Sequence, residues 1–130
     1  MVTGGNFKHG RFCWLDLAAG DAAVARSFYG ALFGWCAEDQ FVGDGHFTRF
    51  VLDETGVASL YQLNRHHLAD GVPSHWTPYL AVIDAEETAS QAAALGAKIL
   101  VKPFDVGKIA RVCLMQDPCG ALIGLWQQKE

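Results

Sequence analysis

Residues 11–33 read RFCWLDLAAGDAAVARSFYGALF, and this stretch decides the fold. Its first part, residues 12–19, is mostly apolar and is predicted to form a strand, whose side chains alternate between two faces. Its second part, residues 22–33, is predicted to form a helix. The helix begins after Asp21, because an aspartate there can accept a hydrogen bond from an unpaired backbone N–H group. One face of this helix carries the apolar side chains of Val24, Phe28 and Leu32.

The order strand, helix and three further strands occurs twice along the chain. When the chain is laid over itself, Asp21 aligns with Asp84. After a single-residue gap, Arg49 aligns with Arg111 and Leu60 with Leu122. A repeat of this length indicates two units with the same fold. Each half is therefore predicted to form a βαβββ module, with Arg49 and Arg111 on equivalent strands.

The predicted elements give the boundaries of the two modules. The first module, residues 10–64, continues with strands at 35–41, 46–53 and 57–64. The second module, residues 75–128, has a strand at 77–83, a helix at 85–95 and strands at 97–102, 108–116 and 121–127. An exposed linker, residues 65–74, joins the modules into a single domain of residues 1–130.

The predicted fold class is α+β, with two curved mixed sheets that each carry a helix on the convex side. One such sheet cannot cover both of its faces alone, so the two modules are expected to pair and to enclose a cleft. An enclosed cleft is the usual place for a small ligand. If Leu15 and Leu17 point to the helix, Trp14 and Asp16 share the other face and point into that cleft.

The composition narrows the class of protein. The chain has 130 residues, of which 51% are hydrophobic and 18% are charged, as is typical of one globular domain. Its formal net charge of −4 and its lack of a Lys/Arg stripe argue against a nucleic-acid partner. No apolar run is long enough to cross a membrane, and the N-terminus lacks the features of a signal peptide. We therefore expect a cytoplasmic protein with four reduced cysteines.

Three stretches resemble the vicinal oxygen chelate superfamily, which includes glyoxalase I, bleomycin-resistance proteins and extradiol dioxygenases. They are WLDLAAGDAAVARSFYGALFGW (14–35), HWTPYLAVIDAEETASQAAALGAKILVKPFDV (75–106) and DPCGALIGLWQ (117–127). The resemblance covers residues 10–127. Within the superfamily, the sequence is most similar to glyoxalase-like members that carry C-W-x-D-L near the N-terminus. It implies the two-module fold, a small-molecule ligand and a homodimer. The modules could pair within one chain or across two.

The resemblance also implies where a metal would bind. In metal-dependent members, the first and last strands of each module each provide a ligand, usually His or Gln on the former and Glu on the latter. Carried over by position, the four sites fall on Trp14, Gln62, Thr77 and Gly124. The tryptophan indole only donates hydrogen bonds, glycine has no side chain and threonine is a poor ligand. Divalent metals need three or four protein donors, so we predict neither a metal nor another cofactor.

Several of the candidate residues have two alternative roles. Trp14 either fills the vacated metal position or forms a wall against which a ligand stacks. Arg49 and Arg111 either hold an anion such as a carboxylate or pair with acidic side chains. Tyr79 either donates a hydrogen bond to the ligand or packs in the core. The residues predicted to bind the ligand are Trp14, Asp16, Arg49, Gln62, Thr77, Tyr79 and Arg111.

The main hypothesis is a protein that binds a small organic molecule without a metal. The alternative is an enzyme: a lyase, isomerase or dioxygenase whose divalent metal is held by non-standard ligands such as His46, His75 and Gln62. Acid–base chemistry by Asp16 and Tyr79 is its metal-free version. A third possibility is a structural subunit whose cleft is filled by its own side chains. For the expected homodimer, Trp35 and residues 121–126 are candidate interface residues.

Overall fold

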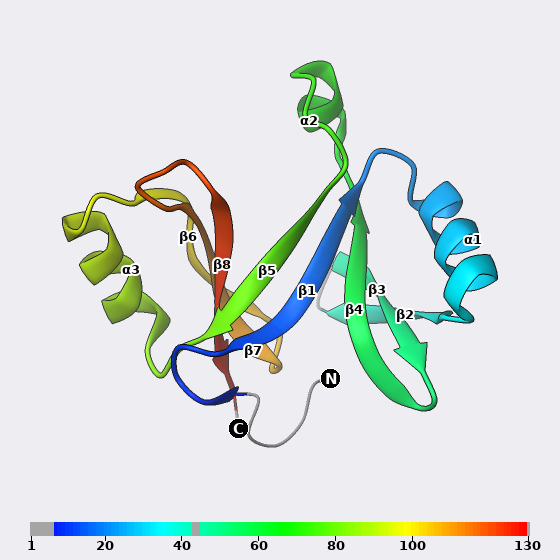
Figure 1. Ribbon diagram of the computed structural model, residues 1–130, viewed down its shortest axis with the longest axis horizontal. Coiled ribbons are helices and arrows are strands. Elements are labelled where there is room, and N and C mark those ends of the chain that lie inside the picture. The colour runs from blue at the N-terminus through cyan, green and yellow to red at the C-terminus, as the bar shows by residue number, and fades with distance from the viewer. Residues whose placement is uncertain (1–6, 43–44, 130) are drawn as a thin grey trace. The chain divides into compact units, whose positions relative to one another are not determined.

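A computed structural model describes residues 7–42 and 45–129, which form two compact units (Figure 1). Of the described residues, the first unit contains 15–77 and the second contains 7–14 together with 78–129. The elements are β1 (Phe12–Ala19), α1 (Ala22–Phe33), β2 (Cys36–Val42), β3 (Gly45–Leu52), β4 (Thr55–Gln62), α2 (Arg65–Ala69), β5 (His75–Ala81), α3 (Ala85–Ala94), β6 (Lys98–Val106), β7 (Ala110–Gln116) and β8 (Leu122–Gln128).

Both units have the same strand topology. The strand order is β2-β3-β4-β1 in the first unit and β5-β8-β7-β6 in the second. β1 pairs with β4 in parallel, as β5 does with β8, whereas the remaining neighbours within each unit are antiparallel. The chain is therefore an α+β protein made of two βαβββ units, which confirms the predicted fold class.

Helix α1 begins and ends as its sequence predicts. The side chain of Asp21 accepts a hydrogen bond from the Val24 backbone N–H at 3.1 Å. Gly34 ends the helix in the left-handed conformation, with φ 75°, and its N–H bonds to the Gly30 carbonyl. Glycine suits this position because it has no Cβ to clash there.

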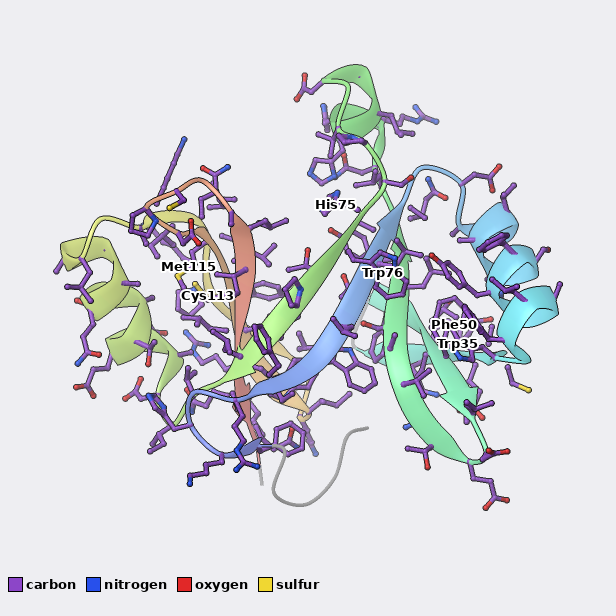
Figure 2. The ribbon with its side chains drawn as sticks, viewed as in Figure 1. Trp35, Phe50, His75, Trp76, Cys113 and Met115 are labelled. Atoms are coloured by element: carbon purple, nitrogen blue, oxygen red, sulfur yellow. The ribbon has the colours of Figure 1, made fainter. Side chains whose placement is uncertain are left out.

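The face of α1 that packs is not the one that carries Val24, Phe28 and Leu32. Ala22, Ala25 and Tyr29 contact the core of the first unit, which contains Leu17, Phe50 and Leu60. Trp35 lies beside Phe50 under the helix (Figure 2) and stacks on Tyr29 at 5.2 Å between ring centroids, so it is partly buried and packs against the core of this unit. The apolar face noted in the sequence remains exposed: Val24 62%, Phe28 56% and Leu32 58%.

The second unit is built in the same way. Asp84 caps α3 by accepting a hydrogen bond from the Glu87 N–H at 3.1 Å. Under α3, Cys113 and Leu125 form a core with Val82, Ala85 and Ala89, and Met115 packs against it (Figure 2). Leu125, from the segment predicted at a dimer interface, is fully buried in this core.

Two details concern segments outside the sheets and the core helices. The linker is not a simple loop, since Asn64 caps the short helix α2 by accepting a hydrogen bond from the His67 N–H at 2.8 Å. Among the described residues, no helix is long and apolar enough to span a membrane.

Candidate functional site

The first unit presents a polar face on the side of its sheet that is opposite α1. Leu17 and Leu60 point toward α1, and they are paired neighbours on β1 and β4. Because side chains alternate along a strand, Asp16 and Ser59, which also pair, point to the other face. This face is defined by Asp16, Glu38, Arg49, Ser59, Tyr61, His75 and Thr77, and we refer to it as the Asp16 face.

Asp16 is a buried carboxyl group in the middle of this face. It is 9% exposed, and its Oδ1 accepts a hydrogen bond from the buried Ser59 hydroxyl at 2.5 Å. Burial raises the pKa of Asp16 to about 6, although the Ser59 hydrogen bond and the electrostatic effect of His75 both oppose the rise. Burial and the negative charge of Asp16 raise the pKa of Tyr61. Asp16 therefore titrates close to neutral pH, where it can accept or donate a proton.

Arg49 lies two strands away from Asp16 in the same row of the sheet. Pairing places Glu38, Arg49 and Ser59 side by side on β2, β3 and β4. The Arg49 Nη2 is 3.5 Å from a Glu38 carboxylate oxygen, and its Nε is buried without a hydrogen-bond partner among the described residues. The guanidinium thus has one weak ion pair and one buried donor that is not hydrogen-bonded to the described residues.

The start of β5 adds two residues to this face. Trp76 points toward α1, where its indole donates a hydrogen bond to the Tyr29 hydroxyl at 3.3 Å. His75 and Thr77 therefore point the other way. The His75 Nδ1 lies 2.8 Å from the Pro73 carbonyl oxygen, and Thr77 is buried. The side chain of His46, the other histidine considered, lies outside the part of the chain that the structure describes.

Gln62 has a structural role that differs from the predicted one. Its Oε1 accepts a hydrogen bond from the Ala22 N–H at 2.8 Å, and its Nε2 donates to the Gly20 carbonyl at 2.7 Å. These bonds fix the loop between β1 and α1. Gln127 does the same in the second unit, where its Oε1 accepts from the Ala85 N–H at 2.8 Å. The amide of Gln62 is committed to the backbone, so ligand binding by Gln62 is not supported.

The second unit has an aromatic cluster where the first has Asp16 and Ser59. Tyr79 pairs with Gly124, and a Cβ atom added at Gly124 would overlap the Tyr79 ring, so this ring lies directly over the glycine. The Trp126 ring centroid is 5.9 Å from that of Tyr79 and 6.1 Å from that of Trp14. All three aromatic residues are buried. Packing within this unit is thus one established role of Trp14 and Tyr79.

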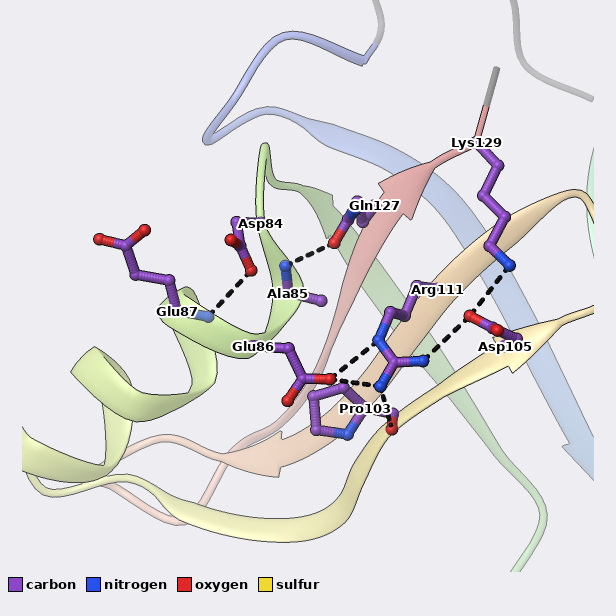
Figure 3. Close-up of polar contacts among 9 residues, drawn as sticks. All are labelled: Asp84, Ala85, Glu86, Glu87, Pro103, Asp105, Arg111, Gln127 and Lys129. Carbon is purple, nitrogen blue, oxygen red and sulfur yellow. Dashed lines mark hydrogen bonds and ion pairs between the residues drawn. The ribbon is translucent and has the colours of Figure 1, made fainter.

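Arg111 forms ion pairs on the helix side of its sheet (Figure 3). Its Nε and Nη2 both donate to Oε1 of Glu86 on α3, the first at 2.9 Å, and its Nη1 donates to Asp105 at 3.0 Å. Lys129 completes the network, with its Nζ 3.0 Å from Asp105. The ion-pairing interpretation therefore holds for Arg111, with partners that were not predicted.

Arg49 and Arg111 are not equivalent, because the two units correspond in a different register from the one that the sequence indicated. Leu17 pairs with Leu60, and Leu80 pairs with Leu125. Leu60 therefore corresponds to Leu125, three positions beyond the predicted Leu122. The predicted alignment was therefore wrong by three residues. An error of an odd number of residues moves each side chain of a strand to the opposite face of the sheet. Arg49 lies on the face away from its helix, whereas Arg111 lies on the helix side with Cys113.

The corrected register also identifies two residues that were missing from the predicted site. Ser59, not Gln62, corresponds to Gly124, because each pairs with the equivalent residue of β1 or β5. Tyr61 follows on the same face and corresponds to Trp126. The sequence signal for this register was that one common shift matches both Leu60 with Leu125 and Gln62 with Gln127.

The residues at the four expected ligand positions do not fit a divalent metal. With the corrected register these are Trp14, Ser59, Thr77 and Gly124. The Ser59 hydroxyl donates to Asp16, and Gly124 lies under the Tyr79 ring. Among the side chains that the structure describes, no group of three His, Cys, Asp or Glu could hold an ion. A metal in this chain would need a different set of ligands.

Comparison with known proteins shows which family this chain is similar to. Residues 11–125 match the Glyoxalase/Bleomycin resistance protein/Dioxygenase superfamily. The "Putative glyoxylase CFP32" of Mycobacterium tuberculosis is 32% identical over 129 residues, which are 98% of this chain and 49% of the relative. The anthracycline biosynthesis protein DnrV of Streptomyces peucetius is 30% identical over 94% of this chain and 48% of the relative. This chain thus spans about half the length of these curated relatives.

Solved structures agree with the fold. The methylmalonyl-CoA epimerase of Mycobacterium tuberculosis superimposes with a TM-score of 0.66 at 14% identity, over 98% of this chain and 93% of the epimerase. The hypothetical protein BH1468 of Bacillus halodurans gives a TM-score of 0.68 at 14% identity, over 95% of this chain and 97% of that protein. Together with the family match over most of its length, this similarity shows that the chain belongs to the Glyoxalase/Bleomycin resistance protein/Dioxygenase superfamily.

Proposed function

We propose that this chain binds a small organic molecule on the Asp16 face of the first unit, without the metal of metal-dependent superfamily members. The observation that carries the proposal is the buried Asp16 carboxyl, which lies on the sheet face opposite the core helix. Burying a carboxyl group is unfavourable unless hydrogen bonds compensate. A ligand that bonds to Asp16 would provide such compensation in addition to that from Ser59.

The relatives support a small ligand without naming it. One curated relative is named as a glyoxylase and another as a protein of anthracycline biosynthesis. A structural neighbour, a methylmalonyl-CoA epimerase, was solved in complex with methylmalonyl-CoA. These proteins concern different molecules, so the class that they share is the small organic ligand. A homodimer and a cytoplasmic location are part of the same proposal.

The test compares ligand binding in two aspartate variants on opposite faces of one sheet. A library of small organic fragments is screened against the wild-type protein by ligand-observed NMR, and each hit is titrated into Asp16→Asn and Asp39→Asn. Asp39 is the control, because it pairs with Arg26 of α1 and with Thr48 on the helix side. Loss of a charge-assisted hydrogen bond should weaken binding roughly 10- to 100-fold in Asp16→Asn.

The result that contradicts the proposal is equally direct. If all fragment hits bind Asp16→Asn as tightly as they bind the wild type, the Asp16 face is not the binding site. If Asp39→Asn weakens binding by the same factor as Asp16→Asn, the loss of affinity comes from a general change in the sheet and not from the loss of a contact with Asp16.

Proton transfer by Asp16 is a second candidate function, favoured by its pKa of about 6. General acids and bases work best when their pKa lies near the working pH. In that case a ligand with an exchangeable C–H group should exchange it for deuterium in D₂O in the presence of the protein. Asp16→Asn should abolish this exchange even at ligand concentrations high enough to overcome its weaker binding. Exchange at an unchanged rate would remove Asp16 from the chemistry.

A further inference from the structure

On one edge of the Arg49 guanidinium, only one of the two nitrogen donors has a hydrogen-bond partner among the described residues. A carboxylate binds an arginine in its strongest geometry through two parallel N–H donors. Nε and Nη2 form one such edge. Within the part of the chain that the structure describes, the Arg49 Nε has no hydrogen-bond partner, and Nη2 has the Glu38 carboxylate at 3.5 Å, the upper limit of a hydrogen bond. A buried N–H group without a partner is uncommon in folded proteins and unfavourable.

In the same molecule, both N–H donors on this edge of Arg111 form hydrogen bonds. Its Nε and Nη2 both donate to Oε1 of Glu86, and its Nη1 donates to Asp105 (Figure 3). Arg111 therefore has the contacts of a structural arginine. Arg49 lacks them, although it lies in the same row of the sheet as Ser59 and Asp16.

We propose that the Nε–Nη2 edge of Arg49 binds an anionic oxygen of the ligand, such as a carboxylate, with the rest of the molecule extending over Ser59 toward Asp16. This inference rests on the proposed function and gives the ligand a chemical class. Adjacent strands are about 4.8 Å apart, so Arg49 and Asp16 are separated by roughly 10 Å. A small organic acid with a second polar group spans this distance. Tyr61 lies on the same face and offers an aromatic ring to an apolar part of the ligand.

Glu38 competes with the ligand for this edge. Its carboxylate is the partner of the Arg49 Nη2, and its side chain is 49% exposed, so it can move away. An incoming carboxylate must displace Glu38 from Nη2 and uncover the buried Nε atom. Neutralising Glu38 should therefore strengthen anion binding. This sign is opposite to that expected from general damage to the fold.

The experiment uses benzoate and benzamide, which have nearly the same shape but differ in charge. Each is titrated into the ¹⁵N-labelled protein at constant ionic strength, and the side-chain Nε–H signals of the arginines are recorded. The Arg49 signal is assigned by its loss in Arg49→Gln. Benzoate should shift the Arg49 signal but not those of Arg26 and Arg111, and benzamide should have little effect.

Three variants test the direction in which the affinity for benzoate should change. Arg49→Gln should weaken benzoate binding about tenfold or more, since it removes the charged donor. Glu38→Gln should tighten it roughly two- to fivefold, as expected for removal of an exposed competing charge. Asp39→Asn is the matched control, because Asp39 neighbours Glu38 on β2 but pairs with Arg26 and Thr48 on the other face. It should leave the affinity unchanged.

Three results would overturn the inference. They are an unshifted Arg49 signal, equal binding of benzoate and benzamide, and a Glu38→Gln variant that binds benzoate no better than Asp39→Asn does. These outcomes are separate from a failure of the proposed function. Neutral ligands that depend on Asp16 would leave the Asp16 face as the binding site and remove only the anion preference.

Discussion

A carboxyl group that is buried against a neighbouring strand holds its proton more tightly than one in water. Asp16 is in this position, with the Ser59 hydroxyl on one of its oxygens and burial as the main influence on its pKa. Its location on the face away from α1 follows from strand alternation and could be predicted from the sequence. Its partner could not, because Ser59 lies far away along the chain and the pairing depends on the register of β4.

Replacing Asp16 by Asn should change how stability depends on pH. Folding raises the pKa of Asp16 from 3.8 to about 6, so the folded state binds this proton more tightly than the unfolded state does. The resulting stabilisation is complete below about pH 4 and is lost as the pH rises through about 6. Across this window the wild type should lose up to about 2–3 kcal/mol relative to Asp16→Asn.

Urea unfolding between about pH 4 and pH 7 measures this difference. The Asn side chain can still accept the Ser59 hydrogen bond, so the variant is expected to fold. Asp39→Asn controls for the removal of a carboxylate from the same unit. If the free energies of unfolding of wild type and Asp16→Asn run parallel over the whole range, the pKa of Asp16 is not raised.

Gly124→Ala should destabilise the second unit. The added Cβ would overlap carbons of the Tyr79 ring, so the ring would have to move. Such overpacking costs about 1–3 kcal/mol. In the Tyr79→Leu background the same substitution should cost less, because the ring is gone. Thermal unfolding of the four proteins gives both costs, and equal costs in the two backgrounds would show that the ring does not cover Gly124.

At the scale of the elements, α1 rests on its sheet through small and aromatic residues. Ala22 and Ala25 let the helix approach closely, and Tyr29 packs among Trp35, Phe50 and Trp76. The larger apolar face of the helix points to solvent. Hydrophobic periodicity correctly predicts a helix over 22–33, but it does not show which face packs, because the size of the apolar side chains does not reveal which side the aromatic residues of the sheet will accept.

Two neighbouring alanine substitutions on α1 distinguish the two faces. Phe28→Ala should change the free energy of unfolding by less than about 0.5 kcal/mol, since its side chain is mostly exposed. Tyr29→Ala should cost roughly 3 kcal/mol, since it removes ring contacts to Trp35, Phe50 and Trp76. Chemical denaturation of both variants is the measurement. A larger loss in Phe28→Ala than in Tyr29→Ala would reverse the assignment of the packed face.

The sequence predicts element boundaries better than it predicts register. Helix α1 and strand β1 have the predicted bounds, because Asp21 and Gly34 are local signals of where the helix begins and ends. The pairing of β4 and β8 is not local. Identities along the repeat matched Leu60 with Leu122, whereas hydrogen bonding in the sheets matches Leu60 with Leu125. This one error put Arg111 on the wrong face and Gln62 into the predicted site.

At the scale of the whole chain, the two units share a scaffold and differ on the face away from the helix. The first unit has the hydrogen-bonded pair of Asp16 and Ser59, and the second has Tyr79 over Gly124 at the equivalent positions. Gln62 and Gln127, which fix the helix starts, are the same in both. The shared residues maintain the fold, and those that differ determine the chemistry of each face.

Removal of metal should therefore leave this protein unchanged. None of Trp14, Ser59, Thr77 and Gly124 offers an imidazole or a carboxylate, the donors that such metals favour. We expect the same Tm and the same fragment affinities before and after treatment with EDTA and removal of the chelator. Elemental analysis of protein purified without chelators should find less than stoichiometric metal. A Tm that falls with EDTA and recovers with one added divalent metal would instead require ligands outside these four positions, and His75 would be the first to replace.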